Sequence, residues 1–510
     1  MARRVLTALV MLFALSTCTL PQATAQLAAR SGGTVAVAYT TEPSSLAPWR
    51  SGDFNAVMVF NALYDTLLTH DDQQRIQPGL ADRFQVSADR TVYTFYLHRG
   101  VKFHDGEALN AAVVKWNVDR WASPPKDYIN GILGVKSSQA VNDMTVQVTL
   151  SAPNNHFLAD ISSPSHSVLP PKAVQDEGED FSFKPVGTGP FRFDRWVTDS
   201  EIDLVRNPNY WRTDAGRALP YLDRLAFRVL PDESSRETAL MAGDIDVNTS
   251  VPPQSVGQLK AQNVFTIFDR PNLGYDALRM LTTKPPFNNK QVRQAVSWAV
   301  DRDAINKAVY FGLGIAGSGL YSPSTPGYDA SYKPYVPRNL ATARELLSQA
   351  GVPDGFAAPM IVGSPVFQQM AVLLQAQLAQ VGIRFTIQNV ERGVFLNGIV
   401  QRQWASYLDR ILVRTDPSDY YDHLRCGGVY NGHDYCNHQV DTMVDQGLSQ
   451  FGSLGDPKRV VLFRQAERMV MDDAPLVILD YPPILYAWKS SIHGIVVQPT
   501  GRLFWAYAWR

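Results

Sequence analysis

The segment 422–438 reads DHLRCGGVYNGHDYCNH and concentrates side chains that can bind a metal ion. Three histidines and two cysteines share the spacing H-x2-C-x6-H-x2-C-x-H: His423, Cys426, His433, Cys436 and His438. Thiolates and imidazoles are the usual ligands of zinc, and a structural zinc site takes four ligands. Two cysteines this close can also join in a disulfide if the chain is exported to an oxidising compartment. The residue types therefore leave two possibilities open, a zinc site and a disulfide.

The amino terminus, MARRVLTALVMLFALSTCTLPQATAQ, predicts that the chain is exported. Two arginines precede a mostly apolar segment at 5–20, and Ala23-Thr24-Ala25 supplies the small residues at which a secretory signal peptide is cleaved. We expect a signal peptide at 1–25. The preceding Leu-Ser-Thr-Cys sequence loosely resembles a lipobox, so lipid anchoring at Cys18 is the alternative. In an exported chain the two remaining cysteines are expected to form a disulfide, with the zinc site still open.

Length and composition exclude several classes of function. The chain has 510 residues, 45% hydrophobic and 19% charged, with a formal net charge of −1. This length exceeds one typical hydrophobic core, so two or more domains are expected. The near-zero charge supplies no basic excess for nucleic acid and no polybasic run for anionic lipid. Beyond the amino terminus, no run reaches the roughly 20 apolar residues of a membrane span.

Apolar periodicity predicts an α/β chain with a β-rich first part. Alternating residues indicate strands in GGTVAVAY, RTVYTFYLHRG and MTVQVTL. Helical spacing follows at 340–350 and in VFQQMAVLLQAQLAQVG, and the alternating IRFTIQNV comes directly after it. Helix, glycine and strand in this order form an α/β unit. Ser234-Ser235-Arg236-Glu237 predicts a capping box that begins a short helix, and Gly243 ends that helix.

One motif could indicate a nucleotide-binding enzyme. GLGIAG at 312–317 matches G-x-G-x-x-G, which needs a strand before it and a helix after it to bind a pyrophosphate. Here the preceding sequence has helical spacing and the following SGLYSPSTPGY contains two prolines, so we expect a turn. The H-E-x-x-H, G-x-S-x-G and Walker A patterns do not occur in the sequence. We therefore predict no enzyme activity and no cofactor.

Blocks along most of the mature chain carry a resemblance to a known family. The longest, at 63–120, is LYDTLLTHDDQQRIQPGLADRFQVSADRTVYTFYLHRGVKFHDGEALNAAVVKWNVDR. Further blocks follow in order: VGTGPFRFDRW, RNPNYW, GDIDV, KPPFNNKQVRQAVSWAVDRDAINKAVYFG, ATARELLSQAGVPDGF and LLQAQLAQVGIRF. In these blocks the chain resembles the peptide/nickel class of solute-binding proteins of bacterial ABC importers (family 5), which includes the dipeptide- and oligopeptide-binding proteins.

The resemblance implies a two-lobed periplasmic-binding-protein fold of the large type II class, α/β with an extra, mostly β subdomain. The ligand would be buried between the lobes as a hinge closes. By analogy, strands would cross between the lobes near Phe265–Asn272 and Leu479–Ala487. The implied division is lobe I at 26–50, 188–268 and 483–510, the extra subdomain at 51–187, and lobe II at 269–482.

The implied function is the periplasmic solute-binding component of an ABC importer. Such a protein captures an oligopeptide or related small solute, delivers it to an inner-membrane permease and acts as a monomer without catalysis. Two other functions remain open, a secreted zinc-dependent hydrolase built on the cluster at 423–438 and a protein that presents its ligand to a chemoreceptor. Most histidines lie outside the expected cleft segments, so nickel or haem transport is not expected.

The resemblance also places candidate ligand-binding residues. Many members that bind free peptides pair the ligand's α-ammonium with an acidic group, which in the dipeptide binders is an Asp that follows a Trp and lies three residues before an Asp-Pro. In SYLDRILVRTDPSDYY the Asp-Pro is present, but Val413 occupies the acidic position and the Trp is missing. The candidates in this segment are Asp409, Arg410, Arg414 and Asp416. The early loop and the second lobe add Tyr39, Thr40, Glu42, Tyr275 and Arg279.

These departures suggest that the ligand is not an ordinary peptide. Leu278 and Arg279 also stand where the family has an aromatic residue and an Asn. We hypothesise that the pocket does not bind a free α-ammonium and that its arginines favour a carboxylate or a phosphate, which the guanidinium group can bind through two hydrogen bonds. The alternative is that the arginines near Asp409 and Asp416 face solvent or pair with these acids.

Overall fold

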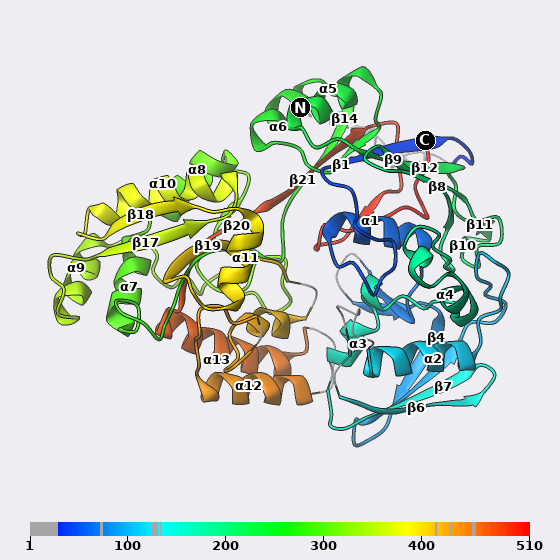
Figure 1. The fold of residues 1–510 in the computed structure, drawn as a ribbon, viewed down its shortest axis with the longest axis horizontal. Helices are drawn as coiled ribbons and strands as arrows, with labels where there is room; N and C mark the ends of the chain where they lie inside the picture. The colour runs from blue at the N-terminus through cyan, green and yellow to red at the C-terminus, as the bar shows by residue number, and fades with distance from the viewer. Residues whose placement is uncertain are drawn as a thin grey trace, which may run out of the picture.

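The computed structural model describes residues 29–71, 75–124, 131–132, 134–154, 156–413, 416–428, 430–450 and 455–510. The expected signal peptide, Cys18 and Arg414 lie outside these residues. Two large sheets form two bodies, and a smaller sheet lies on the side of the first (Figure 1). Within the described ranges, every helix falls short of the length or the apolar character that a membrane span requires.

The first large sheet has seven strands in the order β14-β21-β13-β1-β12-β9-β8. β1 is parallel to both of its neighbours, and its side chains alternate between two cores, one containing helix α1 (Phe54–Leu63) and the other α5 (Glu233–Ala242) and α6 (Val256–Ala261). A strand covered on both faces is apolar throughout, which explains the run TVAVAY. The strands are β1 (Thr34–Tyr39), β8 (Phe191–Val197), β9 (Glu201–Arg206), β12 (Arg224–Val229), β13 (Val247–Asn248), β14 (Phe265–Pro271) and β21 (Pro483–Lys489).

The second large sheet has six strands in the order β16-β20-β15-β19-β17-β18. They are β15 (Tyr275–Met280), β16 (Ile315–Ala316), β17 (Ala357–Val362), β18 (Arg384–Asn389), β19 (Ser406–Ile411) and β20 (Leu476–Tyr481). One core joins the sheet to α7 (Lys290–Ala299), α8 (Arg302–Tyr310), α9 (Leu340–Gln349) and α10 (Pro365–Ala379). Another core joins it to α12 (His438–Ser449) and α13 (Pro457–Asp473), while α11 (Arg392–Val400) packs near β17.

The extra β-rich part is a sheet in the order β4-β5-β7-β6, covered by helix α2 (Ala111–Ala122). Its strands are β4 (Ala81–Val86), β5 (Val92–Leu97), β6 (Val135–Asn142) and β7 (Thr145–Leu150). The predicted alternation in β5 is confirmed, because every second residue is buried. Short elements complete the fold: β2 (Leu68–His70), β3 (Ile76–Pro78), α3 (His156–Asp160), α4 (Pro171–Glu177), β10 (Thr213–Asp214), β11 (Arg217–Ala218), β22 (Val496–Val497), β23 (Leu503–Phe504) and the 3-10 helices η1 (Pro164–His166), η2 (Gly178–Ser182), η3 (Pro253–Ser255) and η4 (Pro417–His423).

Two neighbouring segments carry the chain between the large sheets. β14 and β21 pair as antiparallel strands of the seven-stranded sheet. β14 continues through 272–274 into β15, and β20 continues through Pro482 into β21. The backbone N–H of Asn272 donates to the carbonyl of Pro482 at 2.9 Å, so the crossing segments remain paired between the sheets. The first passage begins at Asn272, the last residue of the first segment that the resemblance indicated, and the second passage, at Pro482, lies within the other segment.

Local sequence signals were mostly correct. The predicted helix at 340–350 is present as α9, and the predicted helix–glycine–strand unit is present as α10 and β18. Strand β17, which lies between α9 and α10 and pairs in parallel with β18, was not predicted from the sequence. GLGIAG follows α8 and contains β16, so it does not open a helix. The capping box at Ser234 was wrong: α5 begins at Glu233, and the carboxylate of Asp232 accepts from the backbone N–H of Ser235 at 2.8 Å. Gly243 ends that helix in the left-handed conformation, as predicted.

Candidate functional site

The candidate residues of the second sheet lie on its paired strands β15 and β19, close to the crossing segments. Tyr275 is opposite Ile411, Asp276 is opposite Arg410, and the pairing continues along both strands. Because successive side chains of a strand point to opposite faces, the side chains of Arg410 and Asp409 lie on opposite faces of the sheet. Arg410 faces α8, whereas Asp409 and Arg279 face the side of α12 and α13.

On the α8 face, Arg410 is held by charge pairing. Its guanidinium donates to both carboxylate oxygens of Asp276 at 2.7 and 3.0 Å and to the hydroxyl of Tyr310 at 2.6 Å. Asp276 is fully buried, and 34% of the Arg410 side chain is exposed. Asp480 on β20 lies beside this group, and neither of its buried oxygens has a hydrogen-bond partner. Burial, with the neighbouring charge of Asp276, raises the pKa of Asp480 to about 8, so this carboxyl is mostly neutral at pH 7.

On the opposite face, Arg279 is fully buried against His433. Its guanidinium donates to Nδ1 of the imidazole at 2.8 Å and lies over the Tyr407 ring. Burial, and then the charge of Arg279, holds the pKa of His433 well below its usual range. Because arginine can only donate, Nδ1 accepts and the neutral imidazole carries its proton on Nε2. His433, expected as a possible metal ligand, is therefore a partner of Arg279.

On the face of Arg279, the carboxylate of Asp409 has no hydrogen-bonded cation among the described residues. It lies 3.9 Å from Nη1 of Arg279, beyond hydrogen-bond distance, and 14% of its side chain is exposed. Burial raises the pKa of Asp409, and the positive charges of Arg279 and Arg392 oppose that rise. The neighbouring hydroxyls of Tyr275 and Tyr407 are buried without a hydrogen-bond partner. Asp409 therefore has free acceptor capacity in a polar and aromatic environment, where a cationic group would compensate its burial.

Asp416, in contrast, is an internal structural residue. Both carboxylate oxygens accept from Arg459 at 2.7 and 3.0 Å, and the exposure of both side chains is 0%. The same carboxylate begins η4 by accepting from the backbone N–H of Ser418. The sequence left open that Asp416 pairs with a nearby arginine. Asp416 is paired, but with Arg459, which is 43 residues away in sequence.

The other candidates come from the seven-stranded sheet. Tyr39, the last residue of β1, is buried, and its hydroxyl has no hydrogen-bond partner. Thr40 is half-buried just beyond it. Glu42 accepts from the indole N–H of Trp196 and, at 2.9 Å, from the backbone N–H of Asp199. The structure therefore places the early loop at the carboxyl end of β1, where one oxygen of Glu42 is already engaged.

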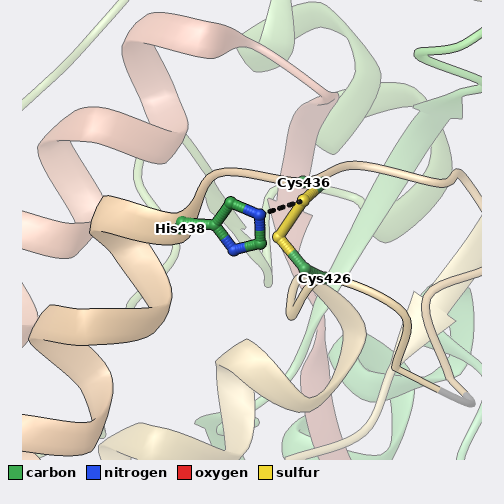
Figure 2. A group of neighbouring side chains, drawn as sticks. All are labelled: Cys426, Cys436 and His438. Carbon is green, nitrogen blue, oxygen red and sulfur yellow. Dashed lines mark hydrogen bonds between the residues drawn. A yellow bond between two sulfur atoms is a disulfide. The ribbon is translucent and has the colours of Figure 1, made fainter.

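The cysteines form the predicted disulfide. Cys426 and Cys436 are bonded, and Nε2 of His438 lies 3.9 Å from the sulfur of Cys436 (Figure 2). Both sulfurs are consumed, so neither can be a thiolate ligand of zinc. The remaining histidines are separated, since His433 binds Arg279 and His423 lies near the carbonyl of Tyr430. The four-ligand zinc site that would support a hydrolase is thus not assembled in this structure.

Comparison with known proteins identifies the family. The profile of the bacterial extracellular solute-binding proteins, family 5, matches residues 75–431. The chain belongs to this family. The two-lobed α/β fold and the family predicted from the sequence are confirmed, and the solute-binding function of an ABC importer component follows from that membership.

Relatives of this family-5 protein differ in what they bind. The glutathione-binding protein GsiB of Pectobacterium atrosepticum is 29% identical over 89% of this chain and 90% of its own. The periplasmic binding protein DppA of Helicobacter pylori, in complex with the peptide STSA, is 28% identical, with a TM-score of 0.80 over 94% of this chain and 99% of its own. AgaA from A. tumefaciens R10, in complex with agropinic acid, is 25% identical, with a TM-score of 0.80 over 93% and 98%.

Sequence reasoning missed several residues of this candidate site. Asp276, Tyr310, Tyr407 and Asp480 contact or neighbour the candidates but come from four separate segments. The alternating strand pattern could have placed Asp276 and Arg410 on one face. Their pairing depends on the register between β15 and β19, which spans 134 residues of sequence and has no local signal.

The disulfide can be tested by thiol titration. In protein that lacks residues 1–25, we expect no free thiol before reduction and two after it, measured in denaturant. Reduction should lower the free energy of unfolding by about 3 kcal/mol, because the unfolded chain then gains the freedom of an open loop. Two free thiols in the unreduced protein, together with one tightly bound zinc ion, would contradict the disulfide and support the zinc site.

The buried pair of Asp416 and Arg459 should be important for stability. Asp416→Asn keeps an acceptor for η4 but leaves a buried guanidinium without a counter-charge, so we expect a loss of about 3 kcal/mol in urea-induced unfolding. The matched control is Asp445→Asn, since Asp445 forms an exposed ion pair with Arg425 at 2.8 Å. That change should cost less than about 1 kcal/mol. Equal effects of the two substitutions would show that Asp416 is not a stabilising residue.

Proposed function

We propose that this protein captures a short peptide, or a peptide-like solute such as glutathione, and delivers it to an inner-membrane ABC permease. Family membership supports the solute-binding role. The names of the relatives support the chemical class, because they include a glutathione-binding protein and a protein in complex with a tetrapeptide. AgaA, in complex with agropinic acid, extends the class to amino-acid derivatives that are not peptides.

The free acceptor capacity of Asp409 is the observation that carries this proposal. A half-buried carboxylate without a hydrogen-bonded cation is costly, and the α-ammonium of a peptide is the missing partner. Arg279 lies behind Asp409 and is already bonded to His433, while Arg410 is neutralised by Asp276. These pairings favour recognition of an ammonium group by Asp409 over recognition of an anion by the arginines. In this proposal Asp409 replaces the acidic anchor that is missing at Val413.

The proposed binding mode is burial between two lobes. Lobe I would comprise 26–50, 188–268 and 483–510, lobe II 269–482, and the extra subdomain 51–187. The crossing segments at 272–274 and Pro482 would act as the hinge. Closure would bring Tyr39, Thr40 and Glu42 from lobe I toward Tyr275, Arg279, Asp409 and Arg410 from lobe II. Binding would then shift the population from open to closed, because only the closed form contacts the ligand from both sides.

Location and assembly form part of the same proposal. The signal sequence at 1–25 supports export to the periplasm, with lipid anchoring at Cys18 as the alternative. The protein would act as a monomer, and it would bind its solute without chemical change. Presentation of the same ligand to a chemoreceptor would use the same site, so binding experiments do not distinguish these two outcomes; the import of labelled solute by cells with and without the permease does.

Calorimetry with glutathione, a dipeptide and its N-acetylated form tests the ligand class. We expect micromolar binding of the free peptides, and Asp409→Asn should weaken it by about tenfold to a hundredfold because a charge-assisted hydrogen bond is lost. The affinity for the acetylated peptide should not change in the variant. Asp445→Asn is the control and should behave as wild type.

Two outcomes contradict the proposal in different ways. Failure of all free peptides to bind, with tight binding of a dicarboxylate or a phosphate ester, would favour the anionic-ligand hypothesis. Binding of free peptides that Asp409→Asn leaves unchanged would keep the peptide class and remove Asp409 as its anchor.

A further inference from the structure

Another connection joins the two bodies. Helix α3 lies beside the four-stranded sheet, away from β14 and β21 (Figure 1). The imidazole of His156, at the start of α3, contacts Asp419 in η4, which packs with the six-stranded sheet. Their atoms, Nε2 and Oδ1, are 2.7 Å apart. Nearby, Nη1 of Arg90, in the turn between β4 and β5, donates to the carbonyl of Ser449 at the end of α12 at 2.8 Å. Both contacts join the two bodies in addition to the crossing segments and to the packing of Leu313, just after α8, against the core that contains α5 and α6.

The His156 contact is an ion pair that is largely shielded from solvent. Nδ1 of the same imidazole lies 3.1 Å from Asp160, so the ring is held between two carboxylates. The exposure of these three side chains lies between 3% and 14%. A cavity of only about 10 Å³ remains beside them, with room for about one water molecule.

Other charged groups surround this contact. His70 from β2 and Arg502 from the segment before β23 line the cavity with Asp160 and Asp419. Burial, and then the charge of Arg502, lowers the pKa of His70 to about 4, so His70 is neutral near pH 7. Behind Asp419, Asp416 is neutralised by Arg459. Of the two histidines at the cavity, His156 is therefore the one that bears charge near pH 7.

We propose that the contact of His156 with Asp160 and Asp419 is a latch that holds the closed arrangement of the two bodies and makes ligand retention depend on pH. This inference rests on the proposed function, since it assigns a regulation to the same closing motion. A contact between the two bodies that lies outside the crossing segments forms only when the bodies approach. Its free energy therefore adds to that of ligand binding, because both favour the closed state.

The direction of the pH dependence follows from the surroundings of His156. Burial by itself lowers the pKa of this imidazole, but the carboxylates of Asp160 and Asp419 outweigh it and raise the pKa well above its ordinary value. Asp160 lies on the same helix, so it raises the pKa of His156 in the open form as well, and only Asp419 adds a further rise on closure. The contact with Asp419 stabilises the closed state fully below the open-form pKa, and this contribution is lost as the pH rises through the closed-form pKa. The latch should therefore hold at pH 6.5 and weaken toward pH 9.5.

Small-angle X-ray scattering of the full mature protein tests the latch without any ligand. In wild type, the radius of gyration should increase from pH 6.5 to pH 9.5. In His156→Gln it should have the larger value at both pH values, because glutamine cannot form the ion pair. The control is His438→Gln, which alters a histidine that is 87% exposed and should follow wild type.

A second variant and a second measurement complete the test. Asp419→Asn retains an acceptor for the backbone N–H of Asp416 and should reproduce the effect of His156→Gln even if the latter does not fold. With glutathione as the probe, both variants should release it about tenfold faster at pH 6.5. If glutathione does not bind to wild type, the proposed ligand class fails, while scattering still tests the latch. Identical radii of wild type and both variants at both pH values would overturn the latch.

Discussion

The paired crossing of the chain between its two large sheets is the constraint on which the rest of this structure depends. β14 and β21 lie side by side, and the Asn272 N–H to Pro482 carbonyl bond continues their pairing beyond the seven-stranded sheet. Two adjacent strands permit rotation about one axis far more readily than separation. Residues near the crossing keep their neighbours during such a rotation, whereas contacts far from it form and break.

This constraint explains why the candidate anchors lie on β15 and β19. Both strands pack in the centre of the six-stranded sheet, close to the crossing, and their polar groups are fixed by partners before any ligand arrives. Arg410 is held by Asp276 and Tyr310, and Arg279 by His433. A preorganised polar group loses little freedom on binding, which increases affinity. Asp409 is left with acceptor capacity because neither arginine reaches it within hydrogen-bond distance.

Buried charges have different roles at different distances from the crossing. Asp416 and Arg459 are completely buried and neutralise each other inside one body. They therefore stabilise that body, and their contact does not depend on how the two bodies are arranged. His156 and Asp419 belong to different bodies, so their ion pair depends on how the bodies are arranged. The same chemistry is structural in the first case and conformational in the second, because only the second pair joins the two bodies that the proposed hinge would move relative to each other.

The sequence by itself determined the α/β class, the family and the disulfide, because these depend on local periodicity, on ordered blocks and on two nearby cysteines in an exported chain. Helices α9 and α10 and strand β18 lie where apolar spacing placed them. Only the tertiary structure decided which charged residues are free: Asp416 is paired 43 positions away and Arg410 134 positions away. Such pairings depend on strand register and helix packing, which bring distant residues within 3 Å and leave no periodic trace in the sequence.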